Sequence, residues 1–237
     1  MTGWRLEVFE ELESTSTVCM ERARAGEPAG LAILALRQTA GRGSRGRVWQ
    51  APEGNLNLSV LLRPRRLAAE AGMFALLAGI AVAEALEGLA PLTITLKWPN
   101  DVLLGQAKLA GILIDAAPAG LGLDWLVIGI GANLREAPRI EGRRVTALGE
   151  HGVDLAPQLV ADAVLARLGF WQDQPAAAIR KAWLARAHVI GTPIEVHAGA
   201  QMLQGSFAGL TPAGELLLRT EDRIETVSTG DVLLGPP

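Results

Sequence analysis

The segment from Gly41 to Trp49 reads GRGSRGRVW and combines three glycines with three arginines. Glycine allows the backbone to approach a phosphate group closely, and an arginine guanidinium binds phosphate or carboxylate oxygens through paired hydrogen bonds. Because the chain has a formal net charge of −3, affinity for an anion must come from a local patch such as this one. The segment therefore predicts an anion-binding loop, with a solvent-exposed turn as the alternative.

Two common phosphate-binding motifs are excluded by the residues around this loop. Gly41, Gly43 and Gly46 match the spacing of a dinucleotide-binding fingerprint, but that motif opens a helix, and the residues after Gly46 predict an irregular segment and then a strand. A P-loop requires lysine and then serine or threonine after its last glycine, whereas this chain has Arg47 and Val48. A nucleic-acid interface is weakly supported, since no recognisable DNA- or RNA-binding motif accompanies the arginines.

A second group of residues that could do chemistry lies at 97–102 (KWPNDV) and 108–115 (KLAGILID). Taken alone, Lys97 and Lys108 are typical of edge strands, where lysine suppresses aggregation, and the Pro-Asn-Asp tripeptide is typical of a turn. Together with the arginine-rich loop, these residues are much harder to explain as purely structural.

The elements expected to position these residues form an α+β fold. Alternating and continuous apolar segments predict strands, with glycine-containing hairpins late in the series; the expected strands are 4–12, 31–37, 55–63, 93–98, 101–104, 107–117 and 123–134. Helices are expected after the Ser/Thr-rich residues 14–17 and over 67–89, 154–170 and 175–187. These segments predict a mixed or antiparallel sheet with helices on one side, followed from about residue 190 by a small β-barrel.

The composition indicates a folded chain with a sizeable core, since 49% of its 237 residues are hydrophobic and no low-complexity tract is present. Cys19 is the single cysteine, which excludes an internal disulfide and favours a cytoplasmic location. The N-terminal residues lack the basic and apolar regions of a secretory signal. Three glutamates interrupt the apolar residues 67–90, so we expect a buried helix there and no membrane span.

Several motifs, taken in their order along the chain, resemble those of the biotin–protein ligases. They are ESTST (13–17), QTAGRGSRGRVW (38–49), KWPNDV (97–102), KLAGIL (108–113) and IGIGANL (128–134). The resemblance covers essentially the whole chain. It implies a catalytic domain at 1–188 similar to class II aminoacyl-tRNA synthetases, and an SH3-like β-barrel domain at 189–237. The chain begins at the catalytic domain, so it resembles the monofunctional members, for which no DNA binding is expected.

The resemblance implies a two-step ATP-dependent reaction. Biotin would react with MgATP to give biotinyl-5′-AMP and pyrophosphate, and a lysine of a biotin carboxyl carrier protein would then take the biotinyl group. The Mg²⁺ ion would be held by phosphates and water, so no cage of protein ligands is expected. The alternatives are a lipoate–protein ligase, which shares the fold and the acyl-adenylate chemistry, and a non-catalytic biotin sensor. Pairing of two chains through sheet edges is compatible with the resemblance.

The resemblance also implies roles for individual residues. Lys108 would lie at the junction of carboxylate and phosphate, Arg42 would neutralise both in turn, and Asp101 would orient the incoming amine, act as a base or help to organise Mg²⁺. The residues implied in biotin binding are Ser14, Thr15, Ser16, Gln38, Gly41, Arg42, Gly43, Ser44, Lys108, Gly111 and Ile112. The residues implied in binding ATP or the adenylate are Arg45, Arg47, Trp49, Lys97, Asn100 and Asn133, with Trp49 and Asn133 meeting the adenine.

Two residues depart from the family pattern. Ser16 stands where the family often has asparagine, so a polar contact to biotin would be shorter or lost. Ser44 stands where many members have arginine, and we hypothesise that the adenylate is retained less tightly as a result. We also expect the 41–49 loop to be mobile until an anion binds, because its arginines repel one another.

Overall fold

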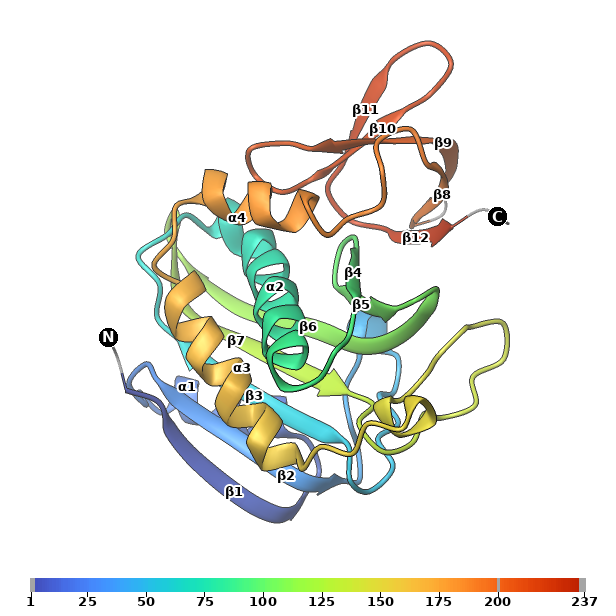
Figure 1. Cartoon of the computed structure of the whole chain (residues 1–237). Helices are drawn as coiled ribbons and strands as arrows, with labels where there is room; N and C mark the ends of the chain where they lie inside the picture. The colour runs from blue at the N-terminus through green and yellow to red at the C-terminus, as the bar shows by residue number, and fades with distance from the viewer. Residues whose placement is uncertain (1–2, 200, 235–237) are drawn as a thin grey trace.

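The computed structural model describes residues 3–199 and 201–234 and contains two sheets (Figure 1). The larger sheet has seven strands in the order β1-β2-β3-β7-β6-β5-β4. These strands are β1 (Arg5–Leu12), β2 (Leu31–Gln38), β3 (Leu56–Leu62), β4 (Ile94–Lys97), β5 (Asp101–Leu104), β6 (Ala107–Ala119) and β7 (Gly122–Ala132). β1 and β2 are parallel and the other neighbours are antiparallel. The predicted α+β fold with a mixed sheet is therefore confirmed.

Helices cover both faces of this sheet, so the expectation of helices on one side is wrong. The helices are α1 (Thr15–Arg24), α2 (Ala71–Leu89), α3 (Pro157–Trp171) and α4 (Ala176–Leu184). α2 and α3 pack on the face seen in front in Figure 1, whereas α1 packs on the opposite face through Cys19 and Ala23. The parallel pair β1 and β2 requires a crossover connection, and α1 forms that crossover. The pattern of the sequence does not reveal which face such a helix takes.

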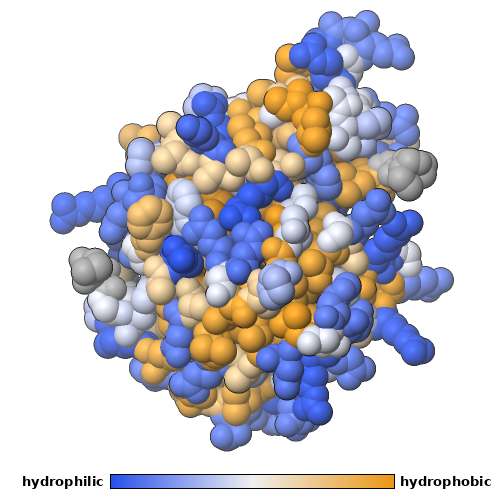
Figure 2. All heavy atoms as spheres, in the orientation of Figure 1, coloured by the Kyte–Doolittle hydropathy of each residue, from blue (hydrophilic) through white to orange (hydrophobic). Residues whose placement is uncertain are grey.

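The long apolar segment forms a core helix, as predicted. Residues Ala68–Leu89 are long and apolar enough to cross a membrane, but 67% of an apolar 18-residue stretch within them is buried inside the protein. α2 packs against α3 and against strands of the large sheet. In Figure 2, which views the molecule from the same side, hydrophobic residues lie among hydrophilic ones across the centre, and the rim is mostly hydrophilic.

The C-terminal residues form a second, fully antiparallel sheet in the order β11-β10-β9-β8-β12. Its strands are β8 (Pro193–Ala198), β9 (Gln201–Leu210), β10 (Leu216–Arg219), β11 (Ile224–Val227) and β12 (Asp231–Leu234). The five predicted short strands are thus present. Within the described residues the sheet is open, with β11 and β12 at its edges, so closure into a barrel stays a prediction. Trp98 Nε1 donates to the carbonyl of Gly214 at 3.0 Å and ties this sheet to the larger one.

Candidate active site

The candidate site is built on one row of residues that crosses five strands of the large sheet. The register pairs Asn57 of β3 with Gly131 of β7, and Gly131 with Gly111 of β6. Gly111 in turn pairs with Asp101 of β5, which pairs with Lys97 of β4. Paired residues in antiparallel strands point to the same face, and alternate residues of β3 and β7 on this face pack on α1. The row places a neutral amide at one end, charged groups at the other, and two glycines between them.

Trp49 lies over the two glycines. A Cβ atom on Gly131 would come within 2.7 Å of Trp49 Cζ2, and one on Gly111 within 3.3 Å of Cζ3. The absence of side chains at these positions therefore creates the space that the indole occupies. The indole Nε1 is buried without a hydrogen-bond partner among the described residues. Lys108 Nζ lies 5.6 Å from the ring centroid, so the ring also borders the charged end of the row.

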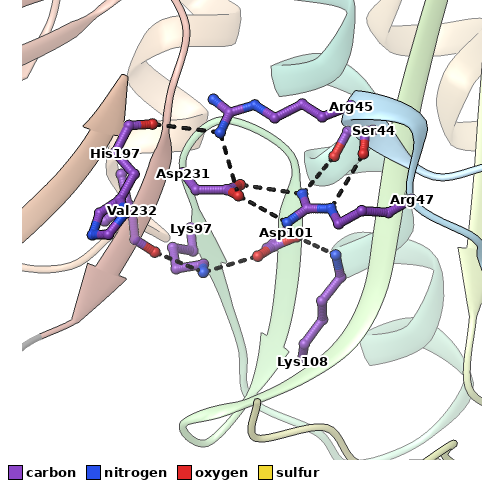
Figure 3. A network of polar contacts seen from close by, with 9 residues as sticks. All are labelled: Ser44, Arg45, Arg47, Lys97, Asp101, Lys108, His197, Asp231 and Val232. Atoms are coloured by element: carbon purple, nitrogen blue, oxygen red, sulfur yellow. Dashed lines mark hydrogen bonds and ion pairs between the residues drawn. The ribbon is translucent and has the colours of Figure 1, made fainter. Parts of the chain in front are cut away.

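Asp101 holds two lysines at the charged end (Figure 3). Its Oδ1 lies 2.5 Å from Lys108 Nζ and its Oδ2 lies 2.9 Å from Lys97 Nζ. Lys97 Nζ also donates to the carbonyl of Val232 in β12 at 3.0 Å. Burial by itself raises the pKa of Asp101, but the Lys108 and Lys97 ammonium groups outweigh burial and hold this pKa below its usual value. Asp101 is therefore a carboxylate at neutral pH, suited to holding an amine and weak as a proton acceptor.

Arg42 connects the arginine-rich loop to the large sheet. Its guanidinium makes a paired contact with the Asp115 carboxylate of β6, at 3.0 and 3.1 Å. Nη1 also donates to Ser16 Oγ at 3.3 Å. Asp115 lies four residues after Gly111, on the same face of β6, so the guanidinium stands beside the row described above.

Arg45 and Arg47 are held by the C-terminal sheet (Figure 3). Arg47 makes a paired contact with the Asp231 carboxylate of β12, at 2.8 and 3.3 Å, and Arg45 Nη1 lies 3.4 Å from the same carboxylate. Arg47 also donates to the carbonyl and the hydroxyl of Ser44. Burial by itself raises the pKa of Asp231, but hydrogen bonding and charge from Arg47 outweigh burial and lower it.

These contacts correct the reason given for a mobile loop. The prediction of a mobile loop rests on repulsion among arginines that lack an anion, but Asp115 and Asp231 supply carboxylates from β6 and β12. Both partners lie far away in the sequence, at separations of 73 and 184 residues from their arginines. Mobility of the loop itself stays a prediction.

The other end of the site is a neutral hydrogen-bonding floor. Ser14, Thr15 and Ser16 come from the N-terminal end of α1 and are buried. Ser14 occupies the N-cap position, but its side chain makes no capping bond and instead lies 3.1 Å from Ser16 Oγ. Gln38 joins them from the end of β2, where its Oε1 accepts from the Thr15 backbone N–H at 2.7 Å.

The floor and Lys108 of the charged end line one pocket, whose empty volume is about 460 Å³ including the open solvent at its mouth. The predicted site residues that line it are Ser14, Thr15, Ser16, Gln38, Arg42, Gly43, Ser44, Trp49, Asn100, Lys108, Gly111 and Ile112. Further lining residues, which the sequence analysis missed, are Asn57, Ser59, Leu113, Gly129, Ile130 and Gly131. The period-two pattern of residues 55–62 carried a signal for the first two, because Asn57 and Ser59 alternate there with leucines.

The other predicted residues, Gly41, Arg45, Arg47, Lys97, Asp101 and Asn133, lie outside this lining. Asn133 follows β7, and its Nδ2 donates to the carbonyl of Thr146 at 3.1 Å. Its Oδ1 is buried without a partner among the described residues. Asn100 Nδ2 donates to the carbonyl of Ile112 at 2.6 Å. The Ile112 side chain is buried in the core beneath α2, so this residue meets the pocket through its backbone.

Residues 3–199 and 201–234 contain no group of three or more His, Cys, Asp or Glu side chains that could hold a metal ion. Asp101, the carboxylate at the charged end, has both oxygens engaged with lysines. A metal ion that enters this site would therefore need most of its ligands from a substrate and from water.

Comparison with known families shows which family the chain belongs to. Residues 8–133 match the family model described as biotin/lipoate A/B protein ligase, and residues 189–235 match the biotin protein ligase C-terminal domain. The chain belongs to the biotin/lipoate A/B protein ligase family. Two members of this ligase family, both named biotin–[acetyl-CoA-carboxylase] ligase, come from Paracoccus denitrificans and Mycobacterium tuberculosis. The Paracoccus ligase is 37% identical to this chain, and the alignment covers 86% of this chain and 90% of the relative. The Mycobacterium ligase is 36% identical, and the alignment covers 98% of this chain and 90% of the relative.

A solved structure of a biotin/lipoate ligase supports the same grouping. The biotin protein ligase from Aquifex aeolicus in complex with biotin and ATP superimposes with a TM-score of 0.82 at 30% identity. The alignment covers 98% of this chain and 99% of that chain. The family expected from the sequence motifs is confirmed.

Proposed function

We propose that the chain is an ATP-dependent biotin–protein ligase, which attaches biotin to a lysine of a biotin carboxyl carrier protein through biotinyl-5′-AMP. The observation that carries the proposal is one pocket with a neutral hydrogen-bonding floor at one end and Lys108 at the other, with Arg42 of the arginine-rich loop also in its lining. Biotin has the matching form, with a neutral cyclic urea at one end and a carboxylate at the other. The relatives from Paracoccus and Mycobacterium are named for this activity, and the Aquifex structure holds biotin and ATP.

The neutral floor favours biotin over lipoate. The dithiolane ring of lipoate has no N–H or O–H donor and only weak sulfur acceptors, so it could form few hydrogen bonds with the hydroxyl and amide groups of the floor. A site built to hydrogen-bond its substrate rejects analogues that lack the bonding group. A sensor without chemistry is disfavoured, since it would not need the Lys108–Asp101 pair at the charged end.

In the proposed first step, a carboxylate oxygen of biotin attacks the α-phosphorus of ATP. A new P–O bond forms, and the bond from the α-phosphorus to the oxygen shared with the β-phosphorus breaks to release pyrophosphate. The two reactants are both anions, so the site must supply positive charge where they meet. We assign Lys108 to the junction of the two groups and Arg42 to the carboxylate. Mg²⁺ enters as part of the nucleotide substrate.

We assign the nucleotide to the part of the site between Trp49 and β12. The free Oδ1 of Asn133 suits the amino group of adenine, and the indole of Trp49 offers a flat apolar surface for the base. Arg45 and Arg47 are assigned to the phosphates, which would have to replace the Asp231 carboxylate as their partner. Lys97 and Asn100 flank this region.

In the proposed second step, the neutral amine of the acceptor lysine attacks the carbonyl carbon of the mixed anhydride. A C–N bond forms, the C–O bond to AMP breaks, and the amine loses a proton. We assign Asp101 to hold the amine, because its lowered pKa makes it a poor proton acceptor. The proton then passes to water or to the departing phosphate.

The proposal also divides the chain into a catalytic domain at 1–188 and an SH3-like domain at 189–237. The separate C-terminal sheet and the match of residues 189–235 to the C-terminal domain model support this division. The two parts share the site, because Asp231 and the Val232 carbonyl reach Arg47 and Lys97.

Transfer of labelled biotin to a purified biotin carrier domain, with ATP and Mg²⁺, tests the proposal. Labelling of a single acceptor lysine is expected, and Lys108→Ala should abolish it. Lys181→Ala removes an exposed lysine of α4 and serves as the matched control, with the wild-type rate expected. If the carrier domain stays unlabelled while a lipoyl domain accepts lipoate, the proposal is refuted in favour of the lipoate ligase.

A further inference from the structure

The Asp231 carboxylate engages two arginines of the anion-binding loop. Arg47 donates to its two oxygens at 2.8 and 3.3 Å, and Arg45 Nη1 lies 3.4 Å from Oδ2. Arg45 also donates to the carbonyl of His197 in β8, the strand that pairs with β12. Burial by itself raises the pKa of Asp231, but the two arginines, with Arg143 from the segment after β7, outweigh burial and lower this pKa. The carboxylate is therefore charged at neutral pH.

Arg47 cannot bind a phosphate through paired donors while it holds Asp231. A guanidinium has five N–H groups, and that of Arg47 makes four hydrogen bonds, two to Asp231 and two to Ser44. Arginine binds a phosphate through two parallel N–H donors, which is the arrangement that the Asp231 carboxylate uses here. The carboxylate and a phosphate group therefore compete for the same donors.

The two arginines stand next to the assigned position of the reaction centre and not at it (Figure 3). Asp101 lies between Lys108 and Lys97. Lys97 in turn donates to the carbonyl of Val232, the residue after Asp231 in β12. Because the α-phosphorus is assigned to Lys108, the donors that Asp231 holds suit the β- and γ-phosphates, which leave as pyrophosphate.

The carboxylate can be displaced while the backbone of β12 stays in place. Asp231 is the first residue of β12, and its backbone is paired with His197 of β8. A Cβ atom on Gly230 would lie 2.8 Å from Val196 Cγ1, so the chain just before Asp231 packs closely on β8. The Asp231 side chain is 32% exposed, and its rotation away from the arginines requires no change in strand pairing. A phosphate group can therefore replace the carboxylate without movement of the C-terminal sheet.

We propose that Asp231 is a specificity-determining residue that competes with the β- and γ-phosphates of ATP for Arg45 and Arg47. This inference rests on the proposed function. Each phosphate brings more charge and more acceptor oxygens than a carboxylate, so a nucleotide with β- and γ-phosphates displaces Asp231, whereas AMP has no group that reaches these donors. Asp231 takes the donors back when pyrophosphate leaves. It therefore lowers the affinity for ATP, which an ion pair that only joins the two sheets would not do.

Calorimetric titration of the full chain in the presence of biotin tests this competition. The probes are AMP and the ATP analogue with a methylene group between the α- and β-phosphorus, which cannot release pyrophosphate. Asp231→Asn should bind the analogue about 3- to 5-fold more tightly than the wild type, because the partly exposed ion pairs no longer have to be broken. AMP should bind the two proteins within about twofold of each other. Asp231→Glu keeps the carboxylate and should bind both probes as the wild type does.

A matched control removes a carboxylate from a similar ion pair outside the pocket. Asp124 lies 2.8 Å from Arg63, the same separation as in the pair of Asp231 with Arg47. Asp124→Asn should bind both probes as the wild type does. In a chain that carries Arg47→Ala, Asp231→Asn should change the affinity for the analogue by less than about twofold, because the main donors for which it competes are gone.

Three results would overturn the inference while biotin transfer to the carrier domain stays intact. The first is an affinity of Asp231→Asn for the analogue that equals or falls below that of the wild type, which would make the ion pair merely structural. The second is an equal gain for AMP and the analogue, and the third is a full gain in the Arg47→Ala chain. If the wild type binds neither probe and supports no pyrophosphate exchange, the inference and the proposed function fail together.

Discussion

Replacement of Gly131 by alanine should weaken ATP binding and leave biotin binding nearly unchanged. The added Cβ would lie within 2.7 Å of Trp49 Cζ2, whereas unstrained carbon atoms approach to about 3.5–4.0 Å. Gly131 belongs to β7, which is paired on both sides by β3 and β6, so the strand cannot move aside. Two further indole atoms, Cε2 and Nε1, would lie closer still, so the indole must shift by roughly 1–2 Å away from the position it takes over the sheet.

The size of the effect follows from the cost of such overpacking. Extra methyl groups in well-packed places typically cost about 1–3 kcal/mol, which corresponds to about a 5- to 150-fold loss of affinity. The loss should fall on ATP, because Trp49 is the residue assigned to the adenine. Biotin should be affected little, because its head is assigned to the neutral floor at Ser14, Thr15 and Gln38.

The measurement is the KM for ATP in biotin-dependent pyrophosphate exchange, together with a calorimetric titration of biotin. Gly88→Ala is the matched control, since a Cβ on Gly88 of α2 would meet nothing within 4 Å, and both constants should equal those of the wild type. An unchanged KM for ATP in Gly131→Ala would refute the placement of the adenine on Trp49. An equal loss for biotin and ATP would refute the separation of the two subsites.

Three further predictions concern the charged end. Lys108→Ala should slow pyrophosphate exchange by about 10²- to 10³-fold, and a variant with more than a tenth of the wild-type rate would contradict its assigned role. Ser44→Arg should slow the release of labelled adenylate in a chase experiment, and an unchanged rate would count against the hypothesis of weak retention. Asp231→Asn should cost about 1 kcal/mol or less of unfolding free energy. This loss should be present above the unfolded-state pKa of about 4 and vanish as pH falls through the lowered folded-state pKa of Asp231. Urea unfolding between about pH 3 and 7 measures this difference, and a loss that is the same at every pH would contradict the ion pair with Arg47.

Local patterns predicted most elements of the fold because each pattern reflects local geometry. The alternating residues 55–63 formed β3, and the glycine-containing turns after residues 104 and 117 joined antiparallel strands as expected. The prediction that all helices lie on one side of the sheet was wrong for α1. The face taken by a crossover helix depends on the handedness of the connection and on the packing of Cys19 and Ala23. Closure of the C-terminal sheet depends on pairing between distant strands, which short-range periodicity does not encode.

The site was predicted only where a motif kept its residues together. The arginine-rich loop and Lys108 were found in this way, and many of the predicted residues line one pocket. The partners Asp115 and Asp231 were missed because strand register and the packing of β12 bring them to the loop from far away in the sequence. Ser59, which lines the pocket, was missed because polar residues that alternate with apolar ones along a strand are also typical of a solvent-exposed face.

Biotin-dependent exchange of labelled pyrophosphate into ATP tests the central claim most directly, with lipoate as the comparison acid and Lys108→Ala as the control. The claim is that one pocket holds a neutral head at its floor and activates the carboxylate at its charged end. It predicts exchange that requires biotin and Lys108 and that lipoate does not support. Exchange with lipoate in place of biotin, or no exchange with either acid, would contradict it.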